Sequence, residues 1–451
     1  MAVPLKILVL ADFAPGGEAE PPLALGPGGV DELMARLQPG LKLGDPLVDL
    51  VFQKMEDFTP AAVTSGRSEL ENPEQLTRVL HHPQFQAIES AWRGLDFLAR
   101  RLAGDQVQVE ILNTPADQVR QRFYDQVFLP EYNGQTEVPL ALALLDFDYD
   151  HKPGSLEVLK DLARMGEALQ VPLVAQTTAS FFGVRHLLHL AALSAVDAKL
   201  MGPEYTSFLS FREHPQATWL GLCVNRFLLR QPYQTVSYQE PASADKPERY
   251  LWGRAIWILG ANLARAWEAQ GHPVGISGIG MGGEQSGLAT RELPLSRKEK
   301  VTTPLEAVLP QPLVEMLPYF GLSPLTQLPA DLGGGQQPDM AYLHLAANLR
   351  RFNDPTGRQP GRLTVYTTLA YSLMLGRASN LALRLAPELA GLAPEEAAQR
   401  LSQGLARELE PLGEGELEVT PAEGGLQVKL VPKILIHSKP VELELEVPLA
   451  G

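Results

Sequence analysis

The chain has 451 residues, of which 45% are hydrophobic and 20% charged, as expected for a folded protein of two or three domains. Its net charge of −15 argues against a general nucleic-acid binder, which needs a basic surface. No run of eighteen apolar residues occurs, so we expect no membrane span. The single cysteine, Cys223, excludes intrachain disulfides and cysteine metal clusters. The absence of disulfides favours a cytoplasmic protein.

A buried strand is the first predicted element. Residues 5–10 form an apolar run of strand-forming side chains, and Asp12 with the Pro-Gly-Gly sequence after it ends the run. A short helical pattern follows at residues 30–37. Residues 42–55 alternate weakly between apolar and polar, and the sequence from Phe52 onward is interpreted as a short strand that runs into a turn.

The strongest helical pattern begins at Pro83, because proline fits the first turn of a helix, where a backbone donor is not needed. The pattern ends before Gly104. His81 and His82 precede it, and paired histidines can bind metal. Since no second group of ligands lies nearby, we interpret them as polar residues at the helix entrance. One face of the helix carries apolar residues at spacings of three and four, namely Phe85, Ile88, Trp92 and Leu95.

A strand, a helix and a second strand predict a βαβ unit in the middle of the chain. Residues 138–145 are a nearly continuous apolar run, typical of a central strand covered on both faces. An amphipathic helix at residues 156–168 and a buried strand at residues 171–176 follow. Asp146 and Asp148 come after the first strand, where carboxylates can bind metal or act as a general base. No convergent motif accompanies these two residues.

The glycines at residues 278–283 match the spacing of the dinucleotide-binding fingerprint. That fingerprint needs a strand before it and a helix that opens inside it. Residues 274–277 are the candidate strand, but the sequence after them is a poor helix start. We therefore expect no nucleotide here, and no cofactor or metal elsewhere. An enzyme that uses Asp146, Asp148 and the loop at Gly278 is the alternative hypothesis.

Two helices and three strands are predicted near the end of the chain. Residues 365–378 form an apolar helical pattern and residues 394–409 an amphipathic one. The segments 416–419, 426–432 and 441–448 alternate as strands do. In the last segment, one face is charged with three glutamates and the other is apolar, formed by Val441, Leu443, Leu445 and Val447.

Several of these segments resemble, in the same order, the large sheath subunit of bacterial type VI secretion systems, a relative of phage contractile-tail sheaths. The segments include residues 80–94 and the sequences Phe181-Phe-Gly, Gly202-Pro-Glu-Tyr and Trp219-Leu-Gly-Leu. The N-terminal sequences at residues 4–13 and 55–63 resemble the small sheath subunit, which is usually a separate chain. The resemblance therefore implies a protomer in which both subunits are fused and shortened.

The resemblance implies a mixed α/β (α+β) fold. In such a fold, a tail-sheath-like core of mixed β-sheets is flanked by helices, and terminal strands form sheets between subunits. The implied division of the chain has three parts. These are a small-subunit-like segment at residues 1–72, a large-subunit-like core at residues 73–380, and a C-terminal arm of helix and strands at residues 381–451.

The resemblance also implies a function. The chain would be a structural subunit in the cytoplasm, not an enzyme, that polymerises with its own copies into a helix around an inner tube and meets a baseplate. The helical region that the family offers to its recycling ATPase is missing from this sequence, so the resemblance does not extend to that partner. The alternatives within the family are a sheath-like baseplate component and a sheath that does not contract.

Strands at both ends of the chain are predicted to join neighbouring subunits. The family links its subunits by strands donated into a shared sheet, and the apolar face of the last strand needs burial. We expect residues 426–451 to add to a sheet of an adjacent subunit, with the N-terminal strand as partner. The alternative is that they complete the chain's own sheet. The predicted interface residues are Leu5, Ile7, Val9, Val441, Leu443, Leu445 and Val447.

Overall fold

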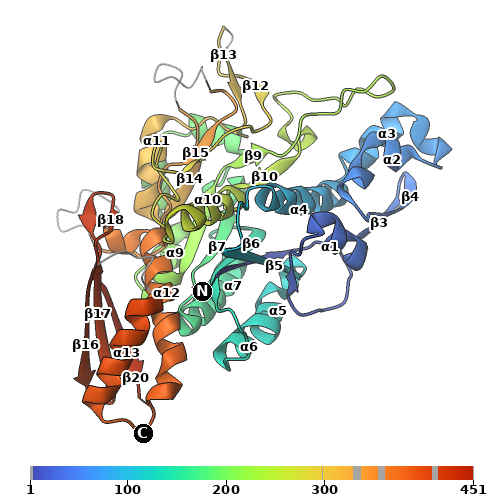
Figure 1. The fold of residues 1–451 in the computed structure, drawn as a ribbon. Helices are drawn as coiled ribbons and strands as arrows, with labels where there is room; N and C mark the ends of the chain where they lie inside the picture. The colour runs from blue at the N-terminus through green and yellow to red at the C-terminus, as the bar shows by residue number, and fades with distance from the viewer. Residues whose placement is uncertain (1–3, 297, 329–336, 354–360, 409–414, 450–451) are drawn as a thin grey trace.

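The computed structural model describes residues 4–296, 298–328, 337–353, 361–408 and 415–449. Its centre is a nine-stranded sheet in the order β11-β15-β14-β8-β7-β6-β1-β5-β2, with helices on both faces (Figure 1). This confirms the predicted mixed α/β class. Within the described residues, no helix is long and apolar enough to cross a membrane.

The middle of this sheet is parallel, and both of its edges are antiparallel. Parallel neighbours need connections that cross a face of the sheet, which explains why helices cover both faces. The parallel strands are β1 (Leu5–Ala11), β5 (Val107–Asn113), β6 (Leu140–Tyr149), β7 (Leu173–Thr177), β8 (Leu220–Val224) and β14 (Leu322–Thr326). The antiparallel edge strands are β2 (Leu23–Ala24), β15 (Ala341–Leu343) and β11 (Glu284–Gln285).

The first strand of the chain lies in the interior of the sheet. In the register of β1, Val9 lies beside Ile111 of β5 on one side and Leu144 of β6 on the other. All seven residues of β1 are buried. The apolar run in the sequence therefore predicted this strand correctly, and the expected βαβ unit is present as β6, α7 (Pro153–Leu169) and β7.

Two layers of helices sandwich the sheet. Helices α1 (Gly29–Leu37), α4 (Pro83–Ala99) and α10 (Ala255–Gln270) share one apolar core with the odd-numbered residues of β1, such as Ile7. Helix α7 and the short helices α5 (Val119–Phe123) and α9 (Thr206–Phe211) lie on the opposite face. They share a second apolar core with the even-numbered residues of β1, such as Leu8. Where α4 meets α10, a Cβ at Gly94 would collide with the ring of Trp257, so this close approach requires glycine.

The N-terminal segment adds a hairpin and short helices beside α4. The hairpin consists of β3 (Gly40–Gly44) and β4 (Leu47–Val51), so the strand expected from Phe52 onward is wrong. Phe52 instead packs against Phe58 and Phe85, with ring centroids 4.4 and 5.7 Å away, because the chain turns through a 3-10 helix there. Helices α2 (Pro60–Thr64) and α3 (Pro73–Leu80) then lead into α4.

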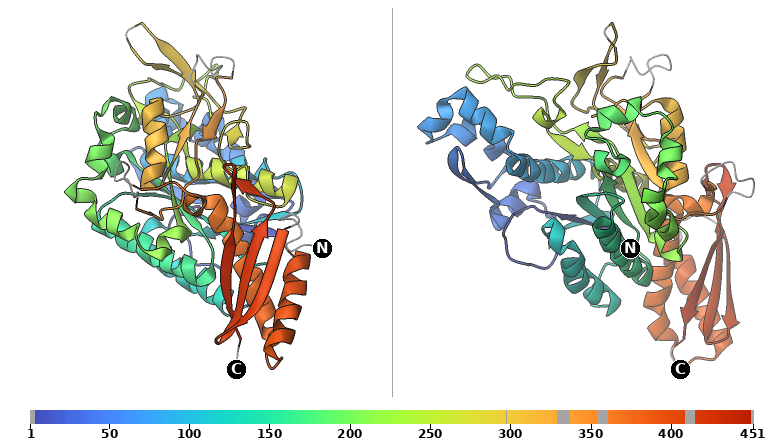
Figure 2. Two further views of the ribbon diagram at one scale, coloured as in Figure 1. Left: turned by 90° about the vertical axis from the view of Figure 1, so that its left-hand side faces the viewer. Right: turned by 180° about the vertical axis from the view of Figure 1, so that it is seen from behind.

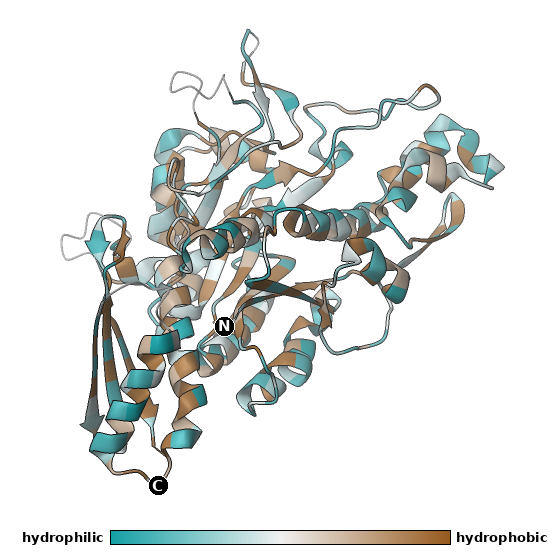
Figure 3. Ribbon diagram, in the orientation of Figure 1, coloured by the Kyte–Doolittle hydropathy of each residue, from teal (hydrophilic) through white to brown (hydrophobic). Residues whose placement is uncertain are grey.

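The C-terminal part forms a separate small layer at one end of the molecule (Figure 2). Three antiparallel strands in the order β16-β17-β20 lie against two helices. Figure 3 shows broad hydrophilic bands on the second helix, in keeping with its amphipathic pattern. The helices are α12 (Leu369–Leu385) and α13 (Pro394–Glu408), and the strands are β16 (Gly415–Ala422), β17 (Gly425–Pro432) and β20 (Leu443–Pro448).

Short elements complete the described chain. Besides the β3-β4 hairpin, three pairs of strands lie outside the two larger sheets among the described residues. They are β9 (Arg226–Leu228) with β10 (Trp252–Arg254), β12 (Arg291–Pro294) with β13 (Lys300–Thr303), and β18 (Leu435–Ile436) with β19 (Lys439–Pro440). The remaining short helices are α6 (Leu129–Tyr132), α8 (Val196–Leu200) and α11 (Gln311–Met316).

Candidate functional site

The N-terminal residues predicted at a subunit interface lie inside the chain's own sheet. Leu5, Ile7 and Val9 are at most 2% exposed. Strand β1 is hydrogen-bonded to β5 on one side and to β6 on the other. In this chain the three residues are therefore core residues, and a contact between subunits through them stays a prediction.

The C-terminal interface residues are also covered by their own chain. Val441, Leu443 and Val447 are at most 1% exposed, and Leu445 is half-buried. Strand β20 pairs with β17, and its apolar face belongs to the core shared with α12 and α13. Within the described residues, β16 and β20 pair on one side only. The backbone groups on their outer edges are the ones that a further strand could use.

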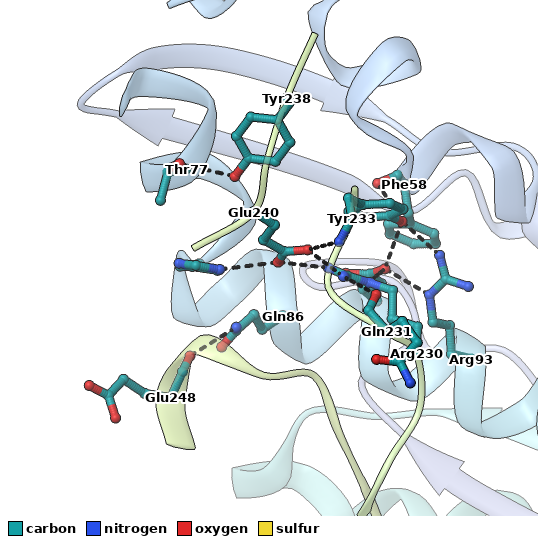
Figure 4. Close-up of polar contacts among 12 residues, drawn as sticks. Phe58, Thr77, Gln86, Arg93, Arg230, Gln231, Tyr233, Tyr238, Glu240 and Glu248 are labelled. Atoms are coloured by element: carbon teal, nitrogen blue, oxygen red, sulfur yellow. Dashed lines mark hydrogen bonds and ion pairs between the residues drawn. The ribbon is translucent and has the colours of Figure 1, made fainter. Parts of the chain in front are cut away.

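A buried ion cluster joins α4 to the loop after β9 (Figure 4). Arg230 lies between two carboxylates: its Nε donates to Glu89 Oε1 at 2.8 Å, and its Nη1 donates to Glu240 Oε2 at 2.7 Å. Glu89 also accepts from Arg93 Nε at 2.7 Å. Glu89 and Glu240 are 0% and 4% exposed. Because each buried carboxylate has a guanidinium partner, the cluster holds no uncompensated buried charge.

Glu240 contacts both sides of this joint. It lies 3.1 Å from His81 Nε2 and accepts from the backbone N–H of Tyr233 at 2.7 Å. Burial alone raises the pKa of a carboxyl, but the hydrogen bonds from His81 and Arg230 hold the pKa of Glu240 at about 2. Glu240 is therefore a charged group that fixes the loop against the end of α3.

Two tyrosines extend the joint into the N-terminal segment. Tyr233 donates its hydroxyl to the carbonyl oxygen of Phe58 at 3.3 Å, and the hydroxyls of Tyr238 and Thr77 lie 3.0 Å apart. Tyr238 is 3% exposed. The loop thus binds Phe58, α3 and α4 together, across more than 140 residues of sequence.

Sequence reasoning missed this cluster. The available signal was Glu89, a charged residue four positions after Phe85 and three before Trp92, and therefore on the apolar side of the helix. A buried carboxylate predicts a cationic partner, but the sequence does not identify Arg230 as that partner because the two residues are far apart in the chain.

Asp146 and Asp148 lie within β6, which extends to Tyr149, so the expectation that they follow the strand is wrong; an ion pair occupies them. Arg254 donates from Nε and Nη2 to the two carboxylate oxygens of Asp148 at 2.8 and 3.0 Å. Its Nη1 lies 3.3 Å from Asp146, which also accepts from Trp257 Nε1 at 3.0 Å. Burial raises the pKa of Asp146, whereas Arg254 outweighs burial at Asp148 and lowers its pKa. The two carboxylates bind the end of β6 to the start of α10.

The glycine loop does not have the dinucleotide-binding geometry. Gly278 and Gly280 have φ angles of 86° and 67° in a turn, with neither a strand before them nor a helix after them. Gly278 lines a cavity of about 590 Å³, whereas Asp146 lines a different one of about 550 Å³. The structure therefore does not bring together the groups of the enzyme hypothesis.

The two histidines considered as metal ligands have structural partners, and the single cysteine is buried. His82 Nδ1 accepts from the backbone N–H of Gln84 at 3.3 Å, so it caps α4 at the helix entrance, and His81 contacts Glu240. In the described part of the chain, no three His, Cys, Asp or Glu residues form a group that could hold a metal ion. Burial raises the pKa of the Cys223 thiol to about 12, so this cysteine is not a reactive thiolate at neutral pH.

Comparisons with known proteins show that this chain is similar to tail sheath proteins. Residues 69–331 match the family model described as VipB: EvpB/VC_A0108, tail sheath N-terminal domain. Over 241 residues, the chain is 24% identical to the type VI secretion system sheath protein TssC1 of Pseudomonas aeruginosa. That match covers 49% of this chain and 48% of the relative, so the chain spans about half the length of the curated relative that it matches.

A solved structure, the sheath tail protein Lin1278 from Listeria innocua, aligns with 77% of this chain and 62% of its own at a TM-score of 0.37 and 10% identity.

Proposed function

Because this chain belongs to the VipB tail-sheath family, we propose that it is a structural subunit that polymerises into a helical sheath around an inner tube. The observation that carries this proposal is the family match over residues 69–331, which include the strands β5 to β14 of the central sheet. Its partners are then further copies of the chain, the tube and a baseplate, and its place of assembly is the cytoplasm.

We further propose that one chain is the complete repeating unit. The resemblance of residues 1–72 to a small sheath subunit would normally call for a second chain. Here those residues supply β1, which lies between β5 and β6. A hydrogen bond from the Tyr233 hydroxyl to the carbonyl oxygen of Phe58, at 3.3 Å, adds a second attachment between these residues and the core. Both features support a unit that needs no separate small subunit.

The C-terminal sheet is the proposed place where copies join. Its outer strands β16 and β20 each have one unpaired edge among the described residues. An added strand would satisfy those backbone groups and extend the sheet between subunits. The segment with the predicted interface residues could take part in two ways. It could stay in its present place and accept a strand from a neighbour, or it could exchange with the same strand of a neighbour. The interface residues in it are Val441, Leu443, Leu445 and Val447.

Electron microscopy of the purified full chain, expressed without any partner, tests the function. We expect helical tubes or rings of regular diameter, formed by the one polypeptide. A protein that stays monomeric across protein concentration and salt would contradict the proposal. Assembly only after a separate small subunit is added would preserve the sheath function but contradict the claim that one chain is complete.

A further inference from the structure

The chain leaves two neighbouring strands of the central sheet in opposite directions. From β1 it continues to β5, on one side, over the face covered by α4. From β6 it continues to β7, on the other side, over the face covered by α7. β1 and β6 are themselves parallel neighbours, with Leu10 beside Leu145. Open α/β sheets bind ligands in the crevice that such diverging loops leave at the carboxyl ends of the two strands.

A cavity of about 550 Å³ lies at this place, and its size suits a small-molecule site. It is lined by residues that follow β1 and β5, by the last part of β6, by the residue before α10, by β3 and by α4. Every lining residue belongs to the described range 4–296. One wall is a single face of α4, with residues at spacings of three and four, namely Gln84, Ala87, Ile88 and Ala91.

Asp12, the residue that follows β1, lines this cavity and has an unpartnered carboxylate oxygen. Its Oδ1 is buried, and no group in the described part of the chain donates a hydrogen bond to it. Arg122 is close enough to lower the pKa of Asp12 but donates instead to the carbonyl oxygens of Asn113 and Gly17, at 2.7 and 3.4 Å. Burial outweighs Arg122 and raises that pKa. A buried acceptor without a donor is costly, so this atom favours a ligand that donates.

Asp146 adds a second carboxylate from the neighbouring strand. It is 5% exposed and lines the same cavity. Its Oδ1 accepts from Trp257 Nε1 at 3.0 Å and lies 3.3 Å from Arg254 Nη1, which leaves Oδ2 able to accept from a ligand.

The two cations of the lining already have partners outside it. Arg254 donates to both carboxylate oxygens of Asp148 at 2.8 and 3.0 Å, and the exposed Lys42 lies 3.3 Å from Asp49. Neither of these aspartates lines the cavity. The cavity therefore has free acceptors, on Asp12 and on its neighbouring strand, whereas its donors are engaged elsewhere.

We propose that this cavity binds a primary ammonium or guanidinium group on a short apolar stem, with Asp12 and Asp146 as acceptors. The group can come from a free small amine or from a lysine or arginine side chain of another copy, since both present the same chemistry. The proposal does not depend on the sheath function, because the soluble chain contains the whole site. The apolar walls that suit the stem are formed by Pro15, Leu41, Ala87, Ile88, Ala91 and Phe147.

Phenethylamine and its neutral counterpart, phenethyl alcohol, test the site on the soluble full chain. Ligand-detected NMR should show saturable binding of phenethylamine and binding of the alcohol that is about tenfold weaker or more, because the alcohol lacks the charge. Asp12→Asn should weaken phenethylamine binding about tenfold or more. The matched control is Asp105→Asn, which changes an exposed aspartate outside the cavity and should bind the amine as the parent does.

Two further measurements distinguish a binding role from a structural one. The melting temperature of Asp12→Asn should equal or exceed that of the parent, because the unpartnered carboxylate adds nothing to folding. Ala87→Leu changes an exposed position of α4 that lines the cavity, and leucine is a good helix former. It should fill the space for the stem and abolish binding of phenethylamine without lowering the melting temperature.

The polymer distinguishes the two sources of the cationic group. If a basic side chain of another copy fills the cavity, the polymer should no longer bind phenethylamine, and Asp12→Asn should polymerise less readily than the parent. If the natural ligand is a free amine, monomer and polymer should bind the probe alike. Either result supports the site. No saturable binding, equal binding of the amine and the alcohol, or full binding by Asp12→Asn would overturn the proposal.

Discussion

Strands β1 and β20 are both apolar strands near an end of the chain, yet they occupy opposite kinds of position. β1 is apolar except for Lys6, is buried on both faces, and has a strand on each side. β20 alternates leucine or valine with glutamate, so only one of its faces is buried, and it is an edge strand of the three-stranded sheet. Continuous apolar sequence fits the interior of a parallel sheet, whereas alternation fits a sheet with one wet face. The N-terminal region is thus closed within the chain, and the C-terminal region is open to another strand.

The largest expected effect comes from placing a charge in β1. Ile7→Asp puts a carboxylate at a position that is 0% exposed, between β5 and β6 and beneath the helix layer of α4 and α10. We expect a loss of about 5 kcal/mol or more in the free energy of unfolding, enough to abolish cooperative folding. Circular dichroism and thermal melting measure it. A cooperative transition within a few degrees of the parent would show that β1 is dispensable.

The next effect in size comes from removing the cation of the ion cluster. Arg230→Met leaves Glu89 and Glu240 buried without their shared partner, which we expect to destabilise the chain by about 3–5 kcal/mol. Arg120→Met, which breaks only the exposed pair with Asp161, is the matched control and should change stability by less than about 1 kcal/mol. Urea unfolding compares the two. Equal, small effects would mean that the cluster does not hold the loop after β9 against α3 and α4.

Acid should weaken the same joint. The pKa of Glu240 is about 2 in the folded chain against 4.5 for an ordinary glutamate, so its contribution to stability is complete above pH 4.5 and is lost as the pH falls toward 2. Between pH 5 and pH 3, the parent should lose about 2 kcal/mol more stability than Glu240→Gln, which cannot titrate. Urea unfolding at the two pH values measures the difference. If both proteins lost the same amount of unfolding free energy, the acid sensitivity would not come from Glu240.

The smallest effect on the main fold is expected from a charge in β20. Val447→Asp has the same chemistry as Ile7→Asp, and Val447 is only 1% exposed. Its strand, however, pairs only with β17. We therefore expect local loss of the C-terminal sheet, whereas the free energy of unfolding of the main fold changes by about 1 kcal/mol or less. Polymerisation should fail. Global unfolding, as severe as that of Ile7→Asp, would contradict the difference between the two regions.

Sequence patterns predicted where helices and strands occur better than they predicted which of them lie side by side. The apolar runs located β1, β6 and β7, and the spacing of Phe85, Ile88 and Trp92 located α4, because each signal is local. The order β5-β1-β6 and the pairing of Arg230 with Glu89 depend on contacts between distant residues, which no local pattern encodes. The hairpin of β3 and β4 was seen only as weak alternation, since Gly40, Gly44 and Pro46 interrupt it.

The C-terminal strands show the same limit. Their alternation predicted strands with one apolar face, and the three strands are present. Alternation does not say which chain covers that face. The structure shows the chain's own α12 and α13 beneath it, and donation to a neighbour stays a prediction.

Amide hydrogen exchange, followed residue by residue on the monomer and on the assembled polymer, tests the contrast between the two regions most directly. The account predicts that β1 amides exchange only through global unfolding in both states. It predicts that the outward amides of β16 and β20 exchange quickly in the monomer and become strongly protected in the polymer. Unchanged exchange at β16 and β20 on assembly, or fast local exchange of β1 in the monomer, would contradict it.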